Sequence, residues 1–147
     1  MEKYMEMALR QAEIAYSKGE VPIGAVIVKD GQVIAKAYNN REKTKNAVGH
    51  AEILAIIKAC KKIGDWRLDG CEMYVTLEPC PMCAGAIVNA RIKTLIYGAD
   101  DKNSNNDLLT LICNDNRLNH NTSIVGGVMK EDCSKIITKF FQERRKK

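Results

Sequence analysis

The sequence predicts an α/β fold, a three-layer α/β/α sandwich around a central five-stranded mixed sheet. Segments with the apolar character of strands alternate along the chain with segments whose apolar residues recur at helical spacing. The chain has 147 residues, of which 46% are hydrophobic and 28% are charged. This length and composition suit one globular domain, predicted over residues 1–147, with a sizeable core.

The chain is predicted to begin with an amphipathic helix and a β-hairpin. Apolar residues recur at three-and-four spacing over Met1 to Lys18. Residues 22–28 and 33–38 are predicted strands, joined by an Asp-Gly turn of the kind that favours tight hairpins. The first strand is almost continuously apolar, which indicates burial on both faces. Gly24 and Ala25 leave room there either for a packed helix or for a flat ring.

A polar loop over residues 39–46 leads to a predicted helix over residues 50–63. His50 therefore lies at a helix N-terminus. Asn39, the first residue after the strand, is well placed to hydrogen-bond a substrate. The apolar stripe of this helix is predicted to consist of Ile53, Leu54, Ile56, Ile57 and Cys60.

The second half of the chain continues the alternation of strands and helices. The predicted elements are a strand over 71–77, a helix opening at Pro79-Cys80-Pro81-Met82-Cys83 and running to Val88, a strand over 94–99, a polar loop over 100–107, a helix over 108–113, a polar loop over 114–121, a short strand over 123–128 and a helix from Glu131 to the end. The predicted helix that carries His50 and the predicted helix that carries Cys80 and Cys83 each follow a strand. Their N-termini should therefore meet above the strand ends, where open α/β sheets place their sites.

One histidine and two cysteines, His50, Cys80 and Cys83, make a candidate zinc site. Three protein ligands leave the fourth position of zinc open for water, as in catalytic sites. Glu52 lies two residues after the histidine and could handle a proton of that water. This H-x-E and P-C-x-x-C pattern is the known signature of zinc deaminases, and it favours hydrolytic removal of an amino group from an electron-poor ring.

Other interpretations of the cysteines fit the pattern less well. Cys-x-x-Cys also occurs in thioredoxin-like redox pairs, which need no His-x-Glu partner. A structural zinc site requires four ligands, and the sequence offers no fourth at motif spacing. The isolated cysteines are predicted to be core residues: Cys60, Cys71, Cys113 and Cys133.

Net charge and the distribution of apolar residues indicate the partners and the cellular location to expect. A net charge of +5 is compatible with a nucleic-acid partner but does not by itself indicate one. Met1 to Lys18 is charged throughout and lacks the apolar region of a signal peptide. The sequence contains no apolar run near the ~20 residues that span a membrane. A cytoplasmic location without membrane association is expected.

The sequence resembles the zinc-dependent nucleobase and nucleoside deaminases of the cytidine deaminase fold, and within them the bacterial tRNA adenosine deaminases. The resemblance covers nearly the whole chain. Its specific parts are Glu20 to Val26, Asn39, His50-Ala51-Glu52, Tyr74 to Ala86, Gly98-Ala99, Asn119-His120, and Phe140-Phe141 followed by basic residues.

The resemblance implies conversion of the wobble adenosine of a tRNA anticodon stem-loop to inosine, by a homodimer with one Zn²⁺ per subunit. His50, Cys80 and Cys83 would bind the zinc, and Glu52 would move protons. The expected substrate contacts are Asn39, Ala51, Pro79, Asp101, Asn119 and His120, and the expected contacts to the RNA backbone are Arg144 and Arg145.

One segment departs from the family pattern. After Gly98-Ala99 the family carries an aspartate, a lysine and then a run of small residues bordering the nucleic acid, whereas this chain has Asn103-Ser104-Asn105-Asn106-Asp107. A free-base deaminase, for example of guanine, is therefore the nearest alternative function. A non-catalytic zinc or RNA-binding module and a thiol oxidoreductase are the alternatives from other classes.

Overall fold

The structure is a computed structural model and describes residues 1–102 and 106–145. Helices and strands alternate as predicted. The helices are α1 (Glu2–Ser17), α2 (Arg41–Thr44), α3 (Ala51–Ile63), α4 (Pro81–Asn89), α5 (Asn106–Asn114) and α6 (Lys130–Arg145). The strands are β1 (Gly24–Lys29), β2 (Gln32–Tyr38), β3 (Cys71–Leu77), β4 (Thr94–Ala99) and β5 (Ser123–Val125).

Within the described residues the strands form one five-stranded sheet in the order β2-β1-β3-β4-β5. β1 is antiparallel to β2 and β3, whereas β3, β4 and β5 are parallel, so the predicted mixed sheet is confirmed. β2, β3 and β4 all end at the same edge, at Tyr38, Leu77 and Ala99. We call this the carboxyl edge, and we call the opposite edge, where β4 and β5 begin, the amino edge.

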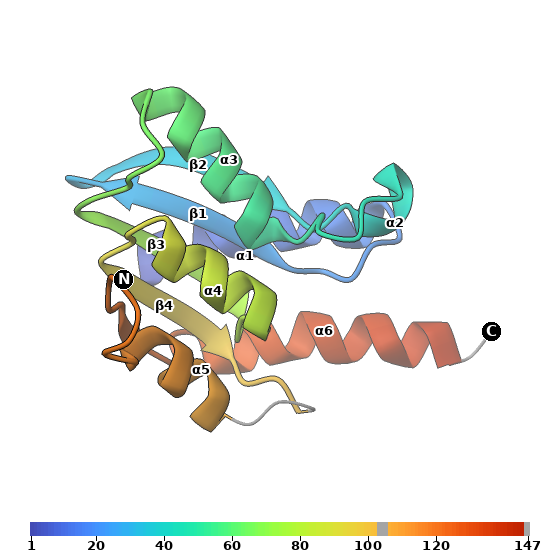
Figure 1. The fold of residues 1–147 in the computed structure, drawn as a ribbon. Helices are drawn as coiled ribbons and strands as arrows, with labels where there is room; N and C mark the ends of the chain where they lie inside the picture. The colour runs from blue at the N-terminus through green and yellow to red at the C-terminus, as the bar shows by residue number, and fades with distance from the viewer. Residues whose placement is uncertain (103–105, 146–147) are drawn as a thin grey trace.

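Helices cover both faces of the sheet, which confirms the three-layer sandwich. Figure 1 shows α3, α4 and α5 on one face and α1 and α6 on the other. Each face has its own apolar core. The first core includes Ala55, Met73, Ile87, Leu95 and Leu109. The second includes Met5, Ala8, Val26, Ile96 and Cys133.

Gly24 packs against the backbone of α1, which decides between the two interpretations of this small residue. A Cβ at Gly24 would lie 2.0 Å from the Ala8 carbonyl oxygen and 2.6 Å from the Ala12 nitrogen. Glycine therefore lets α1 approach the sheet more closely than any other residue would. The helix uses this space, not a bound ring.

The predicted apolar stripe of α3 is right only in part, since Leu54, Ile56 and Cys60 are partly buried and pack against the core. The side chains that face the sheet are the small residues Ala51, Ala55 and Ala59, together with Glu52. Ile57 is 58% exposed. Alanines at this spacing allow the helix axis to lie close to the sheet, and the larger side chains flank the contact or point outward.

Three predicted boundaries also differ from the structure. The polar loop over 39–46 contains the one-turn helix α2. Helix α5 begins earlier than predicted, at Asn106, and residues 103–105 of the atypical segment lie outside the described residues. Strand β5 ends at Val125, and the next residue, Gly126, lies against the ring of Tyr97, where a Cβ would lie 2.5 Å from a ring carbon.

The two ends of the described chain lie at opposite edges of the sheet. The Tyr4 hydroxyl, in α1, donates to the Gly31 carbonyl in the β-hairpin turn at the amino edge (2.8 Å). The Arg144 guanidinium, near the end of α6, donates to the Gly19 carbonyl on the carboxyl side. Figure 1 shows α6 extending beyond the carboxyl edge. Across residues 1–102 and 106–145, no helix has the length and apolar character needed to cross a membrane.

Candidate metal centre and active site

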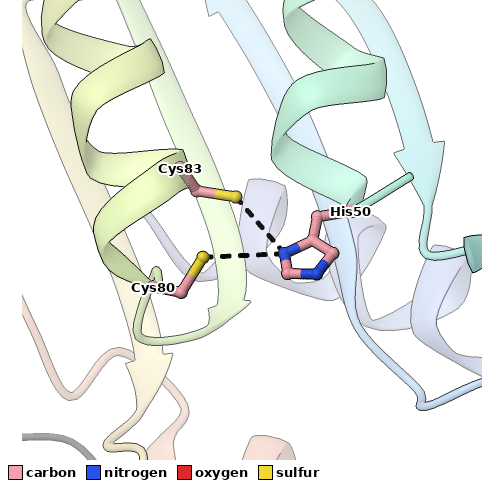
Figure 2. A group of neighbouring side chains, drawn as sticks. All are labelled: His50, Cys80 and Cys83. Atoms are coloured by element: carbon pink, nitrogen blue, oxygen red, sulfur yellow. Dashed lines mark hydrogen bonds between the residues drawn. The ribbon is translucent and has the colours of Figure 1, made fainter. Parts of the chain in front are cut away.

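The structure brings His50, Cys80 and Cys83 together at the carboxyl edge. His50 lies immediately before the first residue of α3, Cys80 immediately before that of α4, and Cys83 in the first turn of α4. The His50 Nδ1 atom is 3.7 Å from the Cys80 Sγ and 3.5 Å from the Cys83 Sγ. Figure 2 shows both sulfur atoms directed at this nitrogen. One nitrogen and two sulfur atoms, all within 4.8 Å of one another, could hold a metal ion.

Local backbone features place the three side chains. Pro81 is the first residue of α4, where its missing N–H breaks no helical hydrogen bond. On the other side, the Asn40 N–H donates to the Gly49 carbonyl (3.1 Å), which fixes the residue before His50. Both helices therefore start at the carboxyl edge and direct their N-terminal turns toward one point.

Hydrogen bonds within the group favour a thiolate at Cys80. The Cys83 thiol and the His50 ring donate to the Cys80 sulfur and lower the pKa of this thiol to about 4. The same hydrogen bond, together with burial, raises the pKa of Cys83. Contact with Cys80 also raises the pKa of His50. A thiolate at a helix N-terminus is the form of cysteine that binds metals.

Glu52 lies beneath this group in the first turn of α3, and it is only 4% exposed. Burial raises the pKa of its carboxyl group to about 7, against smaller lowering effects of its own backbone N–H and of the nearby His50. A carboxyl group with such a pKa exchanges a proton readily near neutral pH. The site thus combines a metal-ligand set with a buried acid–base group.

Four more predicted residues lie at the carboxyl edge. The Asn39 side chain is buried, and its Nδ2 donates to the Val21 carbonyl (3.1 Å). Ala51 is the first residue of α3, and Pro79 is buried next to Cys80. Asp101 follows β4, and its N–H donates to the Glu78 carboxylate (3.1 Å).

Comparison with known proteins identifies the family to which this site belongs. A family model described as MafB19-like deaminase matches residues 1–145. A tRNA-specific adenosine deaminase of Bacillus subtilis (strain 168) is 48% identical over 147 residues, covering 99% of this chain and 91% of the relative. The chain belongs to this deaminase family.

Solved structures agree with the assignment of the chain to these deaminases. A structure from a study of A-to-I editing by tRNA:A34 deaminases matches with a TM-score of 0.83 and 40% identity, covering 91% of this chain and 98% of the other. A guanine deaminase from Bacillus subtilis matches with a TM-score of 0.65 and 44% identity, but covers only 67% of this chain and 64% of the other. The tRNA deaminase is thus matched over more of both chains.

The two arginines predicted to contact RNA lie near the end of α6, on the carboxyl side of this deaminase fold. The Arg144 guanidinium lies over the Phe140 ring, 4.6 Å from its centroid, and donates to the Gly19 carbonyl. Arg145 is exposed. Arg144 therefore holds α6 against the turn that follows α1, and Arg145 presents its charge to solvent.

The structure does not bring Asn119 and His120 to the metal-ligand group. The Nε2 atom of His120 is hydrogen-bonded to the Ile92 carbonyl (2.8 Å), just before β4 begins. Asn119 is exposed beside it. Both residues lie at the amino edge, opposite the candidate site. The prediction that they line the pocket has no support in the geometry of this chain.

Sequence reasoning missed two buried carboxylates near the site. Glu20 and Glu78 are each 2% exposed. Glu20 accepts hydrogen bonds from the backbone of α2, and Glu78 accepts one from Asp101. The available signal was weak: each glutamate stands beside a proline-containing segment at a strand end, where a charged residue is usually solvated.

Proposed function

We propose that this chain is a zinc-dependent aminohydrolase that converts the wobble adenosine of a tRNA anticodon to inosine. The observation that carries the proposal is the convergence of His50, Cys80 and Cys83 above the buried Glu52. The family assignment and the relatives named tRNA-specific adenosine deaminase support the choice of substrate. We propose that the catalytic unit is one domain comprising residues 1–147.

The spacing of the three ligand atoms fits zinc. Zinc binds sulfur at about 2.3 Å and nitrogen at about 2.0–2.1 Å, so a tetrahedral site places these atoms about 3.6 Å apart. The measured distances from the His50 Nδ1 to the two sulfur atoms, 3.7 and 3.5 Å, agree with this value. When bound there, a zinc ion would polarise a water molecule and lower its pKa to about 7.

Glu52 would carry the protons of the reaction. Its carboxylate would take a proton from the water that adds to C6 of adenine, deliver it to the ring nitrogen N1, and later carry the second proton of that water from the added oxygen to the departing amine. Water and adenosine thereby give ammonia and inosine. The N–H of Ala51, in the first turn of α3, would donate to the oxygen that develops at C6.

The residues at the carboxyl edge would hold the RNA. Asn39 would hydrogen-bond the flipped base, with Pro79 and Asp101 bordering it. Arg145 would contact the phosphate backbone, with Arg144 supporting the end of α6. Because tRNA is the proposed substrate, we place the enzyme in the cytoplasm, a setting in which six free cysteines are expected.

We further propose that two copies of the chain form a homodimer through the outer surface of α3, α4 and α5. Large apolar side chains are exposed on all three helices: Ile57, Met82, Leu108 and Leu111. A Cβ added at Gly85, in α4, would have no atom of the described residues within 4 Å. A partner could therefore approach this helix closely. A surface patch of exposed apolar side chains is typical of a protein–protein interface.

The decisive experiment measures deamination of an anticodon stem-loop that carries a wobble adenosine, with free adenine, adenosine, cytidine and guanine assayed in parallel. Inosine formed in the RNA alone is the expected result. Turnover of a free base with no change in the RNA would establish the guanine deaminase type of activity instead. Stoichiometric zinc without deamination of any substrate would leave only a binding module.

A further inference from the structure

Glu20 caps a helix to which it is not adjacent in sequence. Its carboxylate accepts hydrogen bonds from the N–H groups of Glu42 (3.0 Å) and Lys43 (2.7 Å). These are the second and third residues of α2, whose N–H groups an N-cap side chain usually binds. Glu20 is 2% exposed, so this charge is shielded from solvent and satisfied by the backbone.

Helix α2 depends on such external support. It contains four residues, too few to be stable alone. Asn40 stands at its N-cap, but within the described chain its side chain makes no capping hydrogen bond. The Asn39 Oδ1 accepts the N–H of Arg41 (3.4 Å), and Glu20 accepts the next two. A buried carboxylate at a helix N-terminus makes strong, charge-assisted hydrogen bonds.

The capped turn is connected directly to the candidate site. Asn40 donates to the carbonyl of Gly49, the residue before His50 (3.1 Å). A Cβ at Gly49 would lie 3.0 Å from the Asn40 Oδ1 and 3.2 Å from the Arg41 Cα, so this segment is closely packed on α2. Asn39, which precedes α2, is held by the Val21 carbonyl in the segment that Glu20 begins.

We propose that Glu20 is a positioning residue for the active site. By fixing the first turn of α2, its carboxylate holds the segment from Asn39 to Gly49 in the conformation that presents His50 to the metal and Asn39 to the substrate. The part that concerns substrate rests on the proposed function. The part that concerns His50 does not, because metal retention can be measured without any RNA.

The test compares Glu20→Ala and Glu20→Gln with Glu42→Gln as a matched control. Glu20→Ala removes both acceptors, whereas Glu20→Gln keeps one acceptor oxygen. Glu42→Gln removes one negative charge from the first turn of α2, and its side chain is 77% exposed. For each protein, hydrogen exchange is measured by mass spectrometry together with the rate of zinc transfer to a chelator.

We expect exchange to accelerate within residues 39–50 while β3 and β4 stay protected. Zinc release should accelerate about tenfold in Glu20→Ala, given the strength of hydrogen bonds to a charged group, and less in Glu20→Gln. Wild-type zinc release in both variants, or an equal loss of protection throughout the chain, would overturn the proposal. Either result would reduce Glu20 to a contributor to global stability.

Kinetics with the stem-loop add a readout that a purely structural role would not change. In zinc-saturated Glu20→Gln, the KM should rise more than kcat falls, because Asn39 shifts while Glu52 stays in place on α3. A fall in kcat with an unchanged KM would contradict the assignment of Asn39. If the wild-type protein does not deaminate the stem-loop, the proposed function fails, whereas exchange and zinc release still decide the role of Glu20.

Discussion

Glu52 is the charged side chain among the buried residues of α3, and the others are alanines. We expect Glu52→Gln to lower kcat by at least about a hundredfold, since positioned acid–base groups commonly contribute this much. The amide has nearly the same shape as the carboxyl group, so zinc content and stem-loop binding should remain. Single-turnover deamination and zinc analysis measure both effects.

The control for this variant is Glu13→Gln, which makes the same chemical change at an exposed position of α1. Its activity should equal that of the wild-type protein. Deamination at the normal rate by Glu52→Gln would show that another group moves the protons.

Cys80 is the more accessible of the two proposed sulfur ligands. We expect Cys80→Ala to lose most of its bound zinc, because removing one of three protein ligands leaves an incomplete site. Cys60→Ala is the matched control, since Cys60 is equally free but its thiol contacts the Trp66 carbonyl (3.6 Å), away from the ligand group. Zinc per chain, measured by mass spectrometry, should stay near one in the control. Full zinc in Cys80→Ala would show that Cys80 is not a ligand.

At the residue scale, the sequence was informative where chemistry imposes a spacing. The positions of His50, Cys80 and Cys83 follow from their motifs, because both motifs open helices that start at the same edge of the sheet. Glu20 could not be found in this way. Its partners are backbone N–H groups more than twenty residues away, and no residue pattern marks a backbone partner.

At the element scale, Gly24 determines how closely α1 packs on the sheet. We expect Gly24→Ala to lower the free energy of unfolding by about 3 kcal/mol, because the added methyl group overlaps the backbone of α1 and the helix must move. Chemical denaturation followed by circular dichroism measures this change.

Gly85→Ala is the companion variant for Gly24→Ala. Gly85 lies within α4 with free space around it among the described residues, so alanine should stabilise the separated monomer, in protein dilute enough to dissociate the proposed dimer, by up to about 1 kcal/mol. Equal effects of the two substitutions would show that the contact between Gly24 and α1 is not as close as the structure indicates.

The limits of sequence-based prediction are also clear for α3. The helix was predicted correctly, and Leu54, Ile56 and Cys60 of its predicted stripe do pack against the core, but the fully buried residues are the alanines and Glu52. A stripe of isoleucine and leucine and a stripe of alanine occur in the same helix, and hydrophobicity alone selects the larger side chains. The alanines are the fully buried residues, because small side chains allow the helix to lie close to the sheet. The exposed Ile57 is better explained by the proposed dimer.

At the scale of the whole molecule, the outer surface of α3, α4 and α5 makes a testable prediction about assembly. The double variant Ile57→Glu/Leu111→Glu should be a monomer under conditions in which the wild-type protein is a dimer, because each charge would be buried at the interface. Light scattering after gel filtration measures the mass. Ile14→Glu, on the exposed surface of α1, should leave the dimer intact. A wild-type monomer would contradict the proposed assembly.

The positions of Asn119 and His120 follow from topology that the sequence analysis did not use. β4 and β5 are parallel, so the chain must return to the amino edge between them. Residues just before β5 therefore lie far from a site at the carboxyl edge. A family motif can be transferred to a matching position, but its place in the molecule depends on strand direction.

The opposite positions of the two ends of the chain have a practical consequence for engineered fusions. A reporter or enzyme joined before Met1 would project from the amino edge, next to the hairpin turn held by Tyr4. The same partner joined after α6 would stand on the carboxyl side, from which the proposed RNA substrate would approach His50. We expect an N-terminal fusion to retain wild-type turnover of the stem-loop and a C-terminal one to slow it, unless a long flexible spacer intervenes. Side-by-side assays of the two fusions would check this.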